Sequence, residues 1–236
     1  MASAFFVTGT DTGAGKTLVT SSLLLAAASR GFPSLGLKPI ASGSEPDAQG
    51  RLRNEDALAL QAAASVKLPY EEVNAVTLRP AIAPHIAAAE AGIALRAADV
   101  AARCRAVAGA NPHELLLIEG AGGWRVPLNA EESFADIPRA LGLPVVLVVG
   151  LRLGCVNHAL LTAEAIRHDG LRLAAWVGTQ VEPGMARIAD NLQTLRERID
   201  APMLGWIPWQ EGIGPQEAFS RLDPGPLLDD PGAVLS

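Results

Sequence analysis

A glycine-rich segment near the start of the chain contains residues suited to binding phosphate groups. It joins a predicted strand to a predicted helix and reads Gly9-Thr10-Asp11-Thr12-Gly13-Ala14-Gly15-Lys16-Thr17. Glycines let backbone N–H groups crowd around phosphate oxygens, and a helix N-terminus adds partial positive charge. In this pattern the lysine reaches the β- and γ-phosphates and the threonine hydroxyl binds Mg²⁺. The segment therefore predicts a phosphate loop that binds ATP with Mg²⁺.

The loop has one more residue between its first glycine and Gly15 than the common G-x-x-x-x-G-K-[ST] pattern. Gly15-Lys16-Thr17 between a strand and a helix is still a specific signal, and it is favoured over an ordinary helix-capping turn. Switches, motors, kinases and ligases all use such loops, so the loop alone does not name a reaction.

Three more charged residues lie where ligands of a parallel sheet are expected. Glu119 follows the apolar run 115–118, where a second Mg²⁺ ligand opposite a phosphate loop would lie, and the glycines after it allow close approach to a ligand. Lys38 ends the predicted strand 35–38 and is a candidate to meet a phosphate or carboxylate. Asp56 begins a predicted helix, where acids ordinarily favour the helix dipole, and a metal role for it does not follow from its spacing.

Short apolar runs alternate with helical segments along the chain. Strands are predicted at residues 4–8, 35–38, 115–118, 145–149, 171–177 and 203–207, and helices at 17–30, 56–64, 97–107, 157–168 and 186–198. This alternation predicts an α/β fold, a doubly wound, mostly parallel sheet with helices on both faces, as one P-loop domain over residues 1–236. Ligands of such sheets bind beyond the carboxyl ends of the strands. Residues 41–53 are expected to form a loop, and neither 66–95 nor the tail after 210 shows a clear element.

Composition limits the functional class. The chain has 236 residues, a net charge of −6 and no clustered Lys/Arg tract, which argues against a nucleic-acid partner. Its 2 cysteines lack zinc-site spacing and are expected to be free thiols in a reducing compartment. The four histidines show no metal-ligand pairing. With no signal peptide and no bilayer-length apolar run, a soluble cytoplasmic protein without a membrane partner is expected.

Motifs of one known family occur together along most of the chain. They lie at residues 6–12, 15–17, 38–43, 53–57, 84–85, 119–124, 153–158 and 205–209. Together they resemble the dethiobiotin synthetases, ATP-dependent carboxylases of biotin synthesis, and the longer phosphate loop is that family's own.

The resemblance implies a homodimer with the substrate site at the subunit interface, Mg²⁺ as the metal, and ATP, CO₂ and the vicinal diamine 7,8-diaminopelargonic acid as substrates. One amine takes up CO₂ to give a carbamate, whose oxygen attacks the γ-phosphorus of ATP. The other amine closes on the mixed anhydride, which releases phosphate and leaves dethiobiotin, a cyclic urea. Such chemistry needs positioning more than a strong protein base.

The resemblance also assigns roles to single residues. Lys16 and Lys38 would be catalytic by neutralising the γ-phosphate and the carbamate, two anions that must approach each other. Mg²⁺ would be held by Thr17, Asp56 and Glu119. The implied ATP contacts are Gly13, Ala14, Gly15, Lys16, Thr17, Leu18, Glu119, Gly120, Ala121, Gly122, Thr179, Gln180, Ile207, Pro208 and Trp209. The implied substrate contacts are Thr12, Lys38, Ser42 and, at a helix N-terminus of the other subunit, Gly154, Cys155 and Asn157.

One position departs from the family pattern. Better-known members carry an Asn-Asp pair that reads adenine after the strand predicted at 171–177, and this chain has Thr179-Gln180. Both side chains can donate and accept hydrogen bonds, so the base preference stays open. Trp206 and Trp209 are expected in the core on the residues alone.

Two other classes compete with this interpretation. A partitioning-type P-loop ATPase, a switch that binds a protein partner, usually has a second lysine early in the loop, and Asp11 stands there in this chain. An amidotransferase-like ligase would need a Cys–His site for glutamine hydrolysis, and neither Cys104 nor Cys155 lies in a recognisable one.

Overall fold

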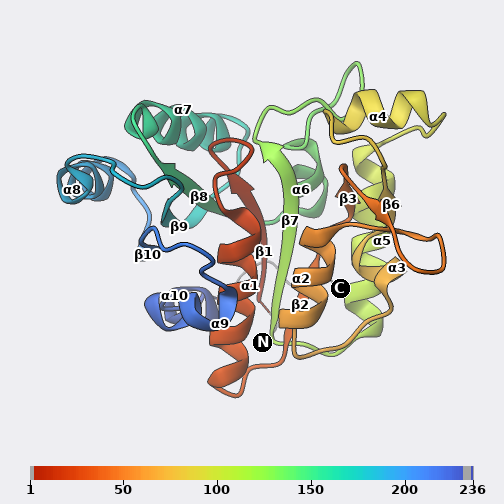
Figure 1. The fold of residues 1–236 in the computed structure, drawn as a ribbon, viewed down its shortest axis with the longest axis horizontal. Helices are drawn as coiled ribbons and strands as arrows, with labels where there is room; N and C mark the ends of the chain where they lie inside the picture. Colours follow the sequence, from red (N-terminus) through yellow and green to blue (C-terminus); the bar gives the residue numbers. More distant parts are fainter. Residues whose placement is uncertain (1–2, 231–234, 236) are drawn as a thin grey trace.

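The computed structural model describes residues 3–230 and residue 235 of the chain. The strands of its central sheet are β1 Ser3–Gly9, β2 Ser34–Leu37, β7 Leu115–Gly123, β8 Val145–Leu151, β9 Leu173–Gln180 and β10 Met203–Ile207. They form a 6-stranded sheet in the order β10-β9-β8-β1-β7-β2, and every neighbouring pair is parallel (Figure 1). The predicted α/β fold with a mostly parallel sheet is confirmed.

Helices cover both faces of this sheet because neighbouring strand residues point to opposite sides. Phe5 and Val7 of β1 pack in one apolar cluster and Phe6 in the other. The first cluster is closed by helices α1 Lys16–Ser29, α2 Glu55–Ala63, α9 Pro215–Ala218 and α10 Gly225–Leu228. The second is closed by α5 Ala97–Ala110, α6 Asp136–Leu141, α7 Cys155–His168 and α8 Ile188–Arg198. Strands covered on both faces must be apolar throughout, which explains the runs seen in the sequence.

Smaller elements fill the segments that the sequence left without structure. The expected loop 41–53 contains an antiparallel pair, β4 Glu45–Pro46 with β5 Leu52–Arg53. Residues 66–95 form α3 Tyr70–Val73, β6 Val76–Thr77 and α4 Pro84–Glu90, and β6 pairs with β3 Ile40–Ala41. The tail holds α9, a 3₁₀ helix η1 Phe219–Arg221, and α10.

Several predicted boundaries are wrong by a few residues, and three of them concern predicted site residues. β7 continues to Gly123, so Glu119 lies inside the strand and pairs in register with Val7 of β1. β9 likewise continues to Gln180, and α7 begins at Cys155 instead of residue 157. Pairing with β1 extends β7 through Glu119 to Gly123, and pairing with β8 extends β9 to Gln180, although most of the added residues are polar or glycine.

The strand order places three predicted site residues together. β7 lies between β1 and β2, so Glu119 on β7 is flanked by the phosphate loop after β1 and by Lys38 after β2. All three strands are parallel, so their carboxyl ends lie at one edge of the sheet. Among the residues that the structure describes, no helix combines the length and apolar character needed to cross a membrane.

Candidate active site

The phosphate loop, residues 9–17, runs from the end of β1 into the first turn of α1. Gly15 adopts a left-handed conformation with φ 86° and precedes Lys16, the first residue of the helix. Because glycine has no capping side chain, the first N–H groups of α1 remain available to an anion. The Lys16 ammonium folds back over the loop and donates to the carbonyl of Asp11 at 3.3 Å. The loop thus has the shape and charge of a phosphate site.

Two features make glycine necessary at position 15: its left-handed backbone conformation and the close approach of Thr179. A Cβ at this position would lie 2.7 Å from Cγ2 of Thr179, a residue of β9. That distance is far below a normal carbon–carbon contact, and the left-handed φ is costly for residues with a Cβ. The loop is therefore seated directly against the end of β9.

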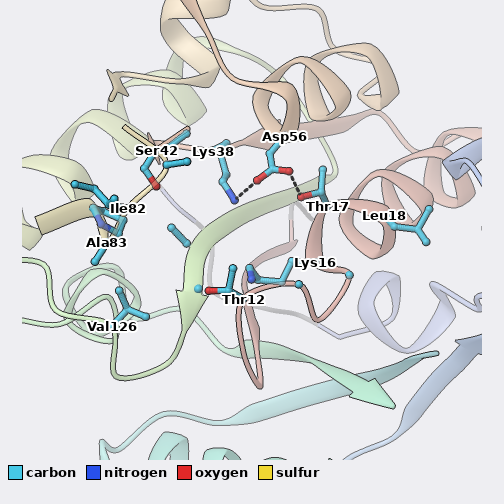
Figure 2. A pocket seen from close by; sticks show the side chains of 17 residues that line it. Thr12, Lys16, Thr17, Leu18, Lys38, Ser42, Asp56, Ile82, Ala83 and Val126 are labelled. Atoms are coloured by element: carbon cyan, nitrogen blue, oxygen red, sulfur yellow. Dashed lines mark hydrogen bonds and ion pairs between the residues drawn. The ribbon is translucent and has the colours of Figure 1, made fainter. Parts of the chain in front are cut away.

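A cluster of charges lies beside the loop, in which Lys38 and Glu119 are buried and Asp56 is partly exposed. Figure 2 shows Lys38, Asp56 and Thr17 of this cluster. The Lys38 ammonium is 2.5 Å from Oε1 of Glu119 and 3.1 Å from Oδ2 of Asp56, and it donates to the carbonyl of Gly120 at 3.0 Å. The Thr17 hydroxyl is 2.7 Å from Oδ1 of Asp56 and 3.0 Å from Oε1 of Glu119. Four segments of the chain thus meet at one group of oxygens.

The two lysines differ in their electrostatics. Burial lowers the pKa of Lys16, and the positive charge of Lys38 lowers it further. Burial acts on Lys38 in the same direction, but the carboxylates of Glu119 and Asp56 outweigh it and raise the pKa of Lys38. Burial would raise the pKa of Asp56, yet the Lys38 ammonium and the Thr17 hydroxyl hold that pKa below its ordinary value. The raised pKa of Lys38 and the lowered pKa of Asp56 both favour the charged forms of these two groups at neutral pH.

A cavity of about 720 Å³ opens over this cluster. The predicted residues that line it are Thr12, Gly13, Gly15, Lys16, Thr17, Leu18, Lys38, Ser42, Asp56, Ala121 and Gly122. Its other wall is apolar and comes from Ala41, Ala81, Ile82, Ala83, Pro84 and Val126. Figure 2 shows Ile82, Ala83 and Val126 on the far side of the cavity from Thr17 and Asp56. The cavity therefore offers charge at one end and an aliphatic surface at the other.

The sequence analysis did not predict this apolar wall. Its residues are small or aliphatic, and they come mainly from the stretch 81–84, which precedes or begins α4. The only sequence signal there was the short motif Pro84-His85. An alanine- and proline-rich stretch has no chemistry of its own, so only its position in the fold makes it part of a site.

Other predicted nucleotide residues lie outside the cavity lining. Ala14 is buried behind the loop, and Gly120 accepts from Lys38. At the ends of β9 and β10, Oε1 of Gln180 accepts a hydrogen bond from the backbone N–H of Trp209 at 3.0 Å. Ile207 is buried and Pro208 half-buried beside them. Trp209 is 44% exposed, so its predicted core position is wrong, whereas Trp206 packs partly buried against the core.

The predicted substrate residues Gly154, Cys155 and Asn157 also lie outside the cavity lining. They occupy the N-terminus of α7, where Gly154 is the left-handed residue before the helix. Arg152, two residues earlier, forms an ion pair with Asp11 of the phosphate loop. Within one chain this helix end is therefore linked to the loop and does not line the cavity.

The side-chain oxygens of Thr17, Asp56 and Glu119, called here the oxygen cluster, are ligands of the kind that a magnesium ion requires. Among the described residues no group of three or more His, Cys, Asp or Glu side chains gathers as a metal cluster. Mg²⁺ bound with a nucleotide needs only one or two carboxylates, a hydroxyl and phosphate oxygens. Thr17, Asp56 and Glu119 supply such oxygens, and Oε2 of buried Glu119 has no hydrogen-bond partner among the described residues. The residues present therefore fit Mg²⁺.

Comparisons with known proteins show the family of the chain. The sequence model of one family, described as an AAA domain, matches residues 3–217. Two curated relatives are both named ATP-dependent dethiobiotin synthetase BioD. The one from Pseudomonas paraeruginosa is 54% identical over 224 residues, covering 95% of this chain and 97% of the relative. The one from Cellvibrio japonicus is 52% identical over 226 residues, covering 96% of this chain and 98% of the relative.

The chain belongs to the ATP-dependent dethiobiotin synthetase family.

Solved structures place this dethiobiotin synthetase family member among P-loop folds. The septum site-determining protein MinD of Pyrococcus horikoshii, complexed with Mg-ADP, matches with a TM-score of 0.55 and 14% identity over 94% of this chain and 87% of that chain. The MinC:MinD complex of Aquifex aeolicus matches with a TM-score of 0.55 and 13% identity over 89% of this chain and 83% of that chain. At such identities the likeness shows the fold alone.

Proposed function

We propose that this protein makes dethiobiotin from 7,8-diaminopelargonic acid, CO₂ and ATP, with release of ADP and phosphate. The observation that carries the proposal is the single cavity in which Lys16 of the phosphate loop and Lys38 face an aliphatic wall. A diamine on a saturated chain has the matching chemistry, since its carbamate is an anion and its remaining carbons are apolar. The names and high identity of the two relatives support the same reaction.

The proposed reaction forms two C–N bonds in succession. One amine attacks CO₂ and loses a proton to give a carbamate, and a carbamate oxygen then displaces ADP from the γ-phosphorus. The second amine attacks the carbonyl carbon of the mixed anhydride, which expels phosphate and closes the cyclic urea. Lys16 and Lys38 would hold the two anions together in the transition state. Removing one such electrostatic group typically costs about 10²–10³ in rate.

Magnesium and the nucleotide would share the oxygen cluster. Thr17, Asp56 and Glu119 would hold Mg²⁺, which when bound neutralises charge that develops on the phosphates. In the structure Lys38 contacts both carboxylates, so it already supplies positive charge where that ion would bind. The remaining ATP contacts would come from Gly13, Ala14, Leu18, Gly120, Ala121 and Gly122, with Thr179, Gln180, Ile207, Pro208 and Trp209 toward the base.

Substrate binding would also involve a second subunit. Thr12, Lys38 and Ser42 would contact the diamine or its carbamate in one chain. Gly154, Cys155 and Asn157 of the second chain would receive the substrate carboxylate at the N-terminus of α7, a 14-residue helix with a favourable dipole. Leu153, two residues before α7, is 95% exposed, and Leu161 of α7 is 56% exposed. The N-terminus of α7 does not line the cavity of its own chain, and exposed leucines lie beside it. Both observations support a site completed by a second subunit.

The partitioning-type ATPase is not favoured as an alternative. The MinD proteins among the solved structures are only 13–14% identical to the chain, so their likeness shows the fold alone and does not support a switch function. Relatives above 50% identity carry the synthetase name over nearly the whole chain.

The test is an assay with ATP, Mg²⁺, bicarbonate and 7,8-diaminopelargonic acid, with dethiobiotin identified by mass spectrometry. Phosphate release is expected to depend on the diamine and to equal the dethiobiotin formed. Phosphate release without the diamine, or no dethiobiotin, would exclude the proposed reaction. Sedimentation velocity on the same sample tests the homodimer.

A further inference from the structure

A buried polar network lies behind the part of the cavity wall that Lys38, Ser42 and Asp56 form. It consists of Asn54, Tyr70 and Asn74, whose exposed fractions are 5%, 6% and 2%. None of these residues lines the cavity, and Tyr70 comes from α3, within the stretch for which the sequence predicted no element. Buried polar side chains need partners, so their contacts show what the network holds.

The phenol of Tyr70 is the centre of this network. Its oxygen accepts a hydrogen bond from the backbone N–H of Asn54 at 2.7 Å. Its hydrogen is donated to Oδ1 of Asn74 at 3.0 Å. One hydroxyl thus uses its donor and an acceptor at once to join Asn54, 16 residues before it, to Asn74, 4 residues after it.

Each asparagine extends the network to a backbone segment that bears a site residue. Nδ2 of Asn74 donates to the carbonyl of Lys38 at 2.6 Å. Nδ2 of Asn54 donates to the carbonyl of Ser42 at 3.1 Å, and Oδ1 of Asn54 accepts from the N–H of Ala57 at 3.3 Å. That last contact caps α2, the helix that carries Asp56 in its first turn.

We infer that Tyr70 is a positioning residue of the active site, acting through Asn54 and Asn74 on Lys38, Ser42 and Asp56. The inference rests on the proposed function for the role of those three residues. Tyr70 sets the distance between the Lys38 segment and the start of α2. It thereby sets the distance between the residues proposed to bind the carbamate, Lys38 and Ser42, and the proposed metal ligand Asp56. It leaves the phosphate loop, which has its own backbone anchors, unaffected.

The energetic reason lies in the donor and acceptor that the phenol satisfies. Without its oxygen, the buried N–H of Asn54 loses its partner, and an unpaired buried donor drives the backbone to shift toward another acceptor. A shift of about 1 Å in a reacting group is enough to lower the rate by roughly 10²-fold. Ring packing, including the Arg53 guanidinium 4.1 Å above the ring centre, would remain in Tyr70→Phe.

The principal test compares Tyr70→Phe with Thr77→Val. The Thr77 hydroxyl also donates to Oδ1 of Asn74, at 2.8 Å, but makes no link to α2. Tyr70→Phe is expected to lower kcat about tenfold or more and to raise KM for the diamine, while KM for ATP changes less than about threefold. Thr77→Val is expected to keep wild-type kcat and KM. Equal losses in both variants, or a lower Tm for Tyr70→Phe with unchanged kinetic constants, would show a structural role only.

A second variant tests the hydrogen bond from Asn54 to the carbonyl of Ser42. Asn54→Ser keeps a good helix cap for α2, but its short side chain cannot reach the Ser42 carbonyl. It is expected to raise KM for the diamine with little change in Tm, and an unchanged KM would contradict the inference.

A crystal structure of Tyr70→Phe separates this inference from the proposed reaction because it needs no assay. The contacts of Lys38 with Asp56 and Glu119 are expected to change, and the phosphate loop is expected to keep its conformation. Unchanged contacts would overturn the positioning role. If wild-type protein makes no dethiobiotin but these contacts do change, the reaction is wrong and the positioning role stands.

Discussion

The two lysines that face the cavity differ in how far along the sequence their contacts lie. Lys16 belongs to a contiguous loop, and its ammonium contacts a carbonyl only five residues away in the sequence. Lys38 contacts carboxylates 18 and 81 residues away, and its own carbonyl is held by Asn74. The first half of the site is local, whereas the second half is assembled from several segments of the fold.

This difference has a physical consequence for function. A loop that closes on its own backbone can bind phosphate in many proteins, since its geometry depends on few other residues. An assembled cluster depends on every segment that contributes to it, and its buried charges must compensate one another. Under the proposed function, the local half would recognise a class of ligand, and the assembled half would make the site specific to one reaction.

The largest expected effect comes from the local half. Lys16→Met should lower kcat by roughly 10³-fold, because under the proposed function it removes a positive charge that would stabilise the γ-phosphate. Steady-state assays with saturating ATP measure this loss. Lys67→Met is the matched control, since Lys67 is the remaining lysine and contacts the carbonyls that end α2. An equal loss in the control would mean that the effect is not specific to the loop.

Lys38→Met sharpens the comparison because it should act in two directions. It is expected to lower kcat by about 10²-fold, and to tighten Mg²⁺ binding without nucleotide by about tenfold, ~1.4 kcal/mol. The reason is that Lys38 now supplies the positive charge between Asp56 and Glu119. Calorimetric titration with MgCl₂ checks this. Lys16→Met should not tighten Mg²⁺ binding, and weaker binding in Lys38→Met would contradict the assembled arrangement.

Two glycines of the loop test how local the local half is. Gly15→Ala meets Thr179 of β9 at 2.7 Å, whereas Gly13→Ala meets no heavy atom within 4 Å. Both have positive φ, 86° and 75°, so both should lose about 1–2 kcal/mol to backbone strain. Only Gly15→Ala should also raise KM for ATP, by about tenfold, because the clash moves the loop. Equal KM values for the two variants would show that the contact with β9 is unimportant.

The smallest expected effect is at the base end. Gln180→Ala removes the acceptor for the Trp209 N–H and should raise KM for ATP two- to fivefold, a loss of roughly 1 kcal/mol or less, with kcat unchanged. Parallel assays with ATP, GTP and CTP measure the base preference. A drop in kcat would mean that this corner also affects the reacting groups.

Sequence patterns predicted the parts of the site that depend on neighbouring residues. The phosphate loop, and the positions of Lys38 and Glu119 at one sheet edge, followed from glycine spacing and from the apolar runs before them. Asp56 was not predicted from spacing, because its helix start looks like any acidic first turn. Tyr70 and the apolar wall at residues 81–84 were missed because short helices broken by prolines leave no periodic signal.

The sequence by itself determined the α/β class, the loop and the family resemblance, because these rest on local propensities and on motifs that survive in one dimension. Only the tertiary structure decided that β7 lies between β1 and β2, which brings Thr17, Lys38 and Glu119 together. It also decided that Lys38 is buried with a raised pKa and that Tyr70 joins the segments around it. Burial and long-range hydrogen bonds depend on which segments become neighbours, and that information exists only once the chain has folded.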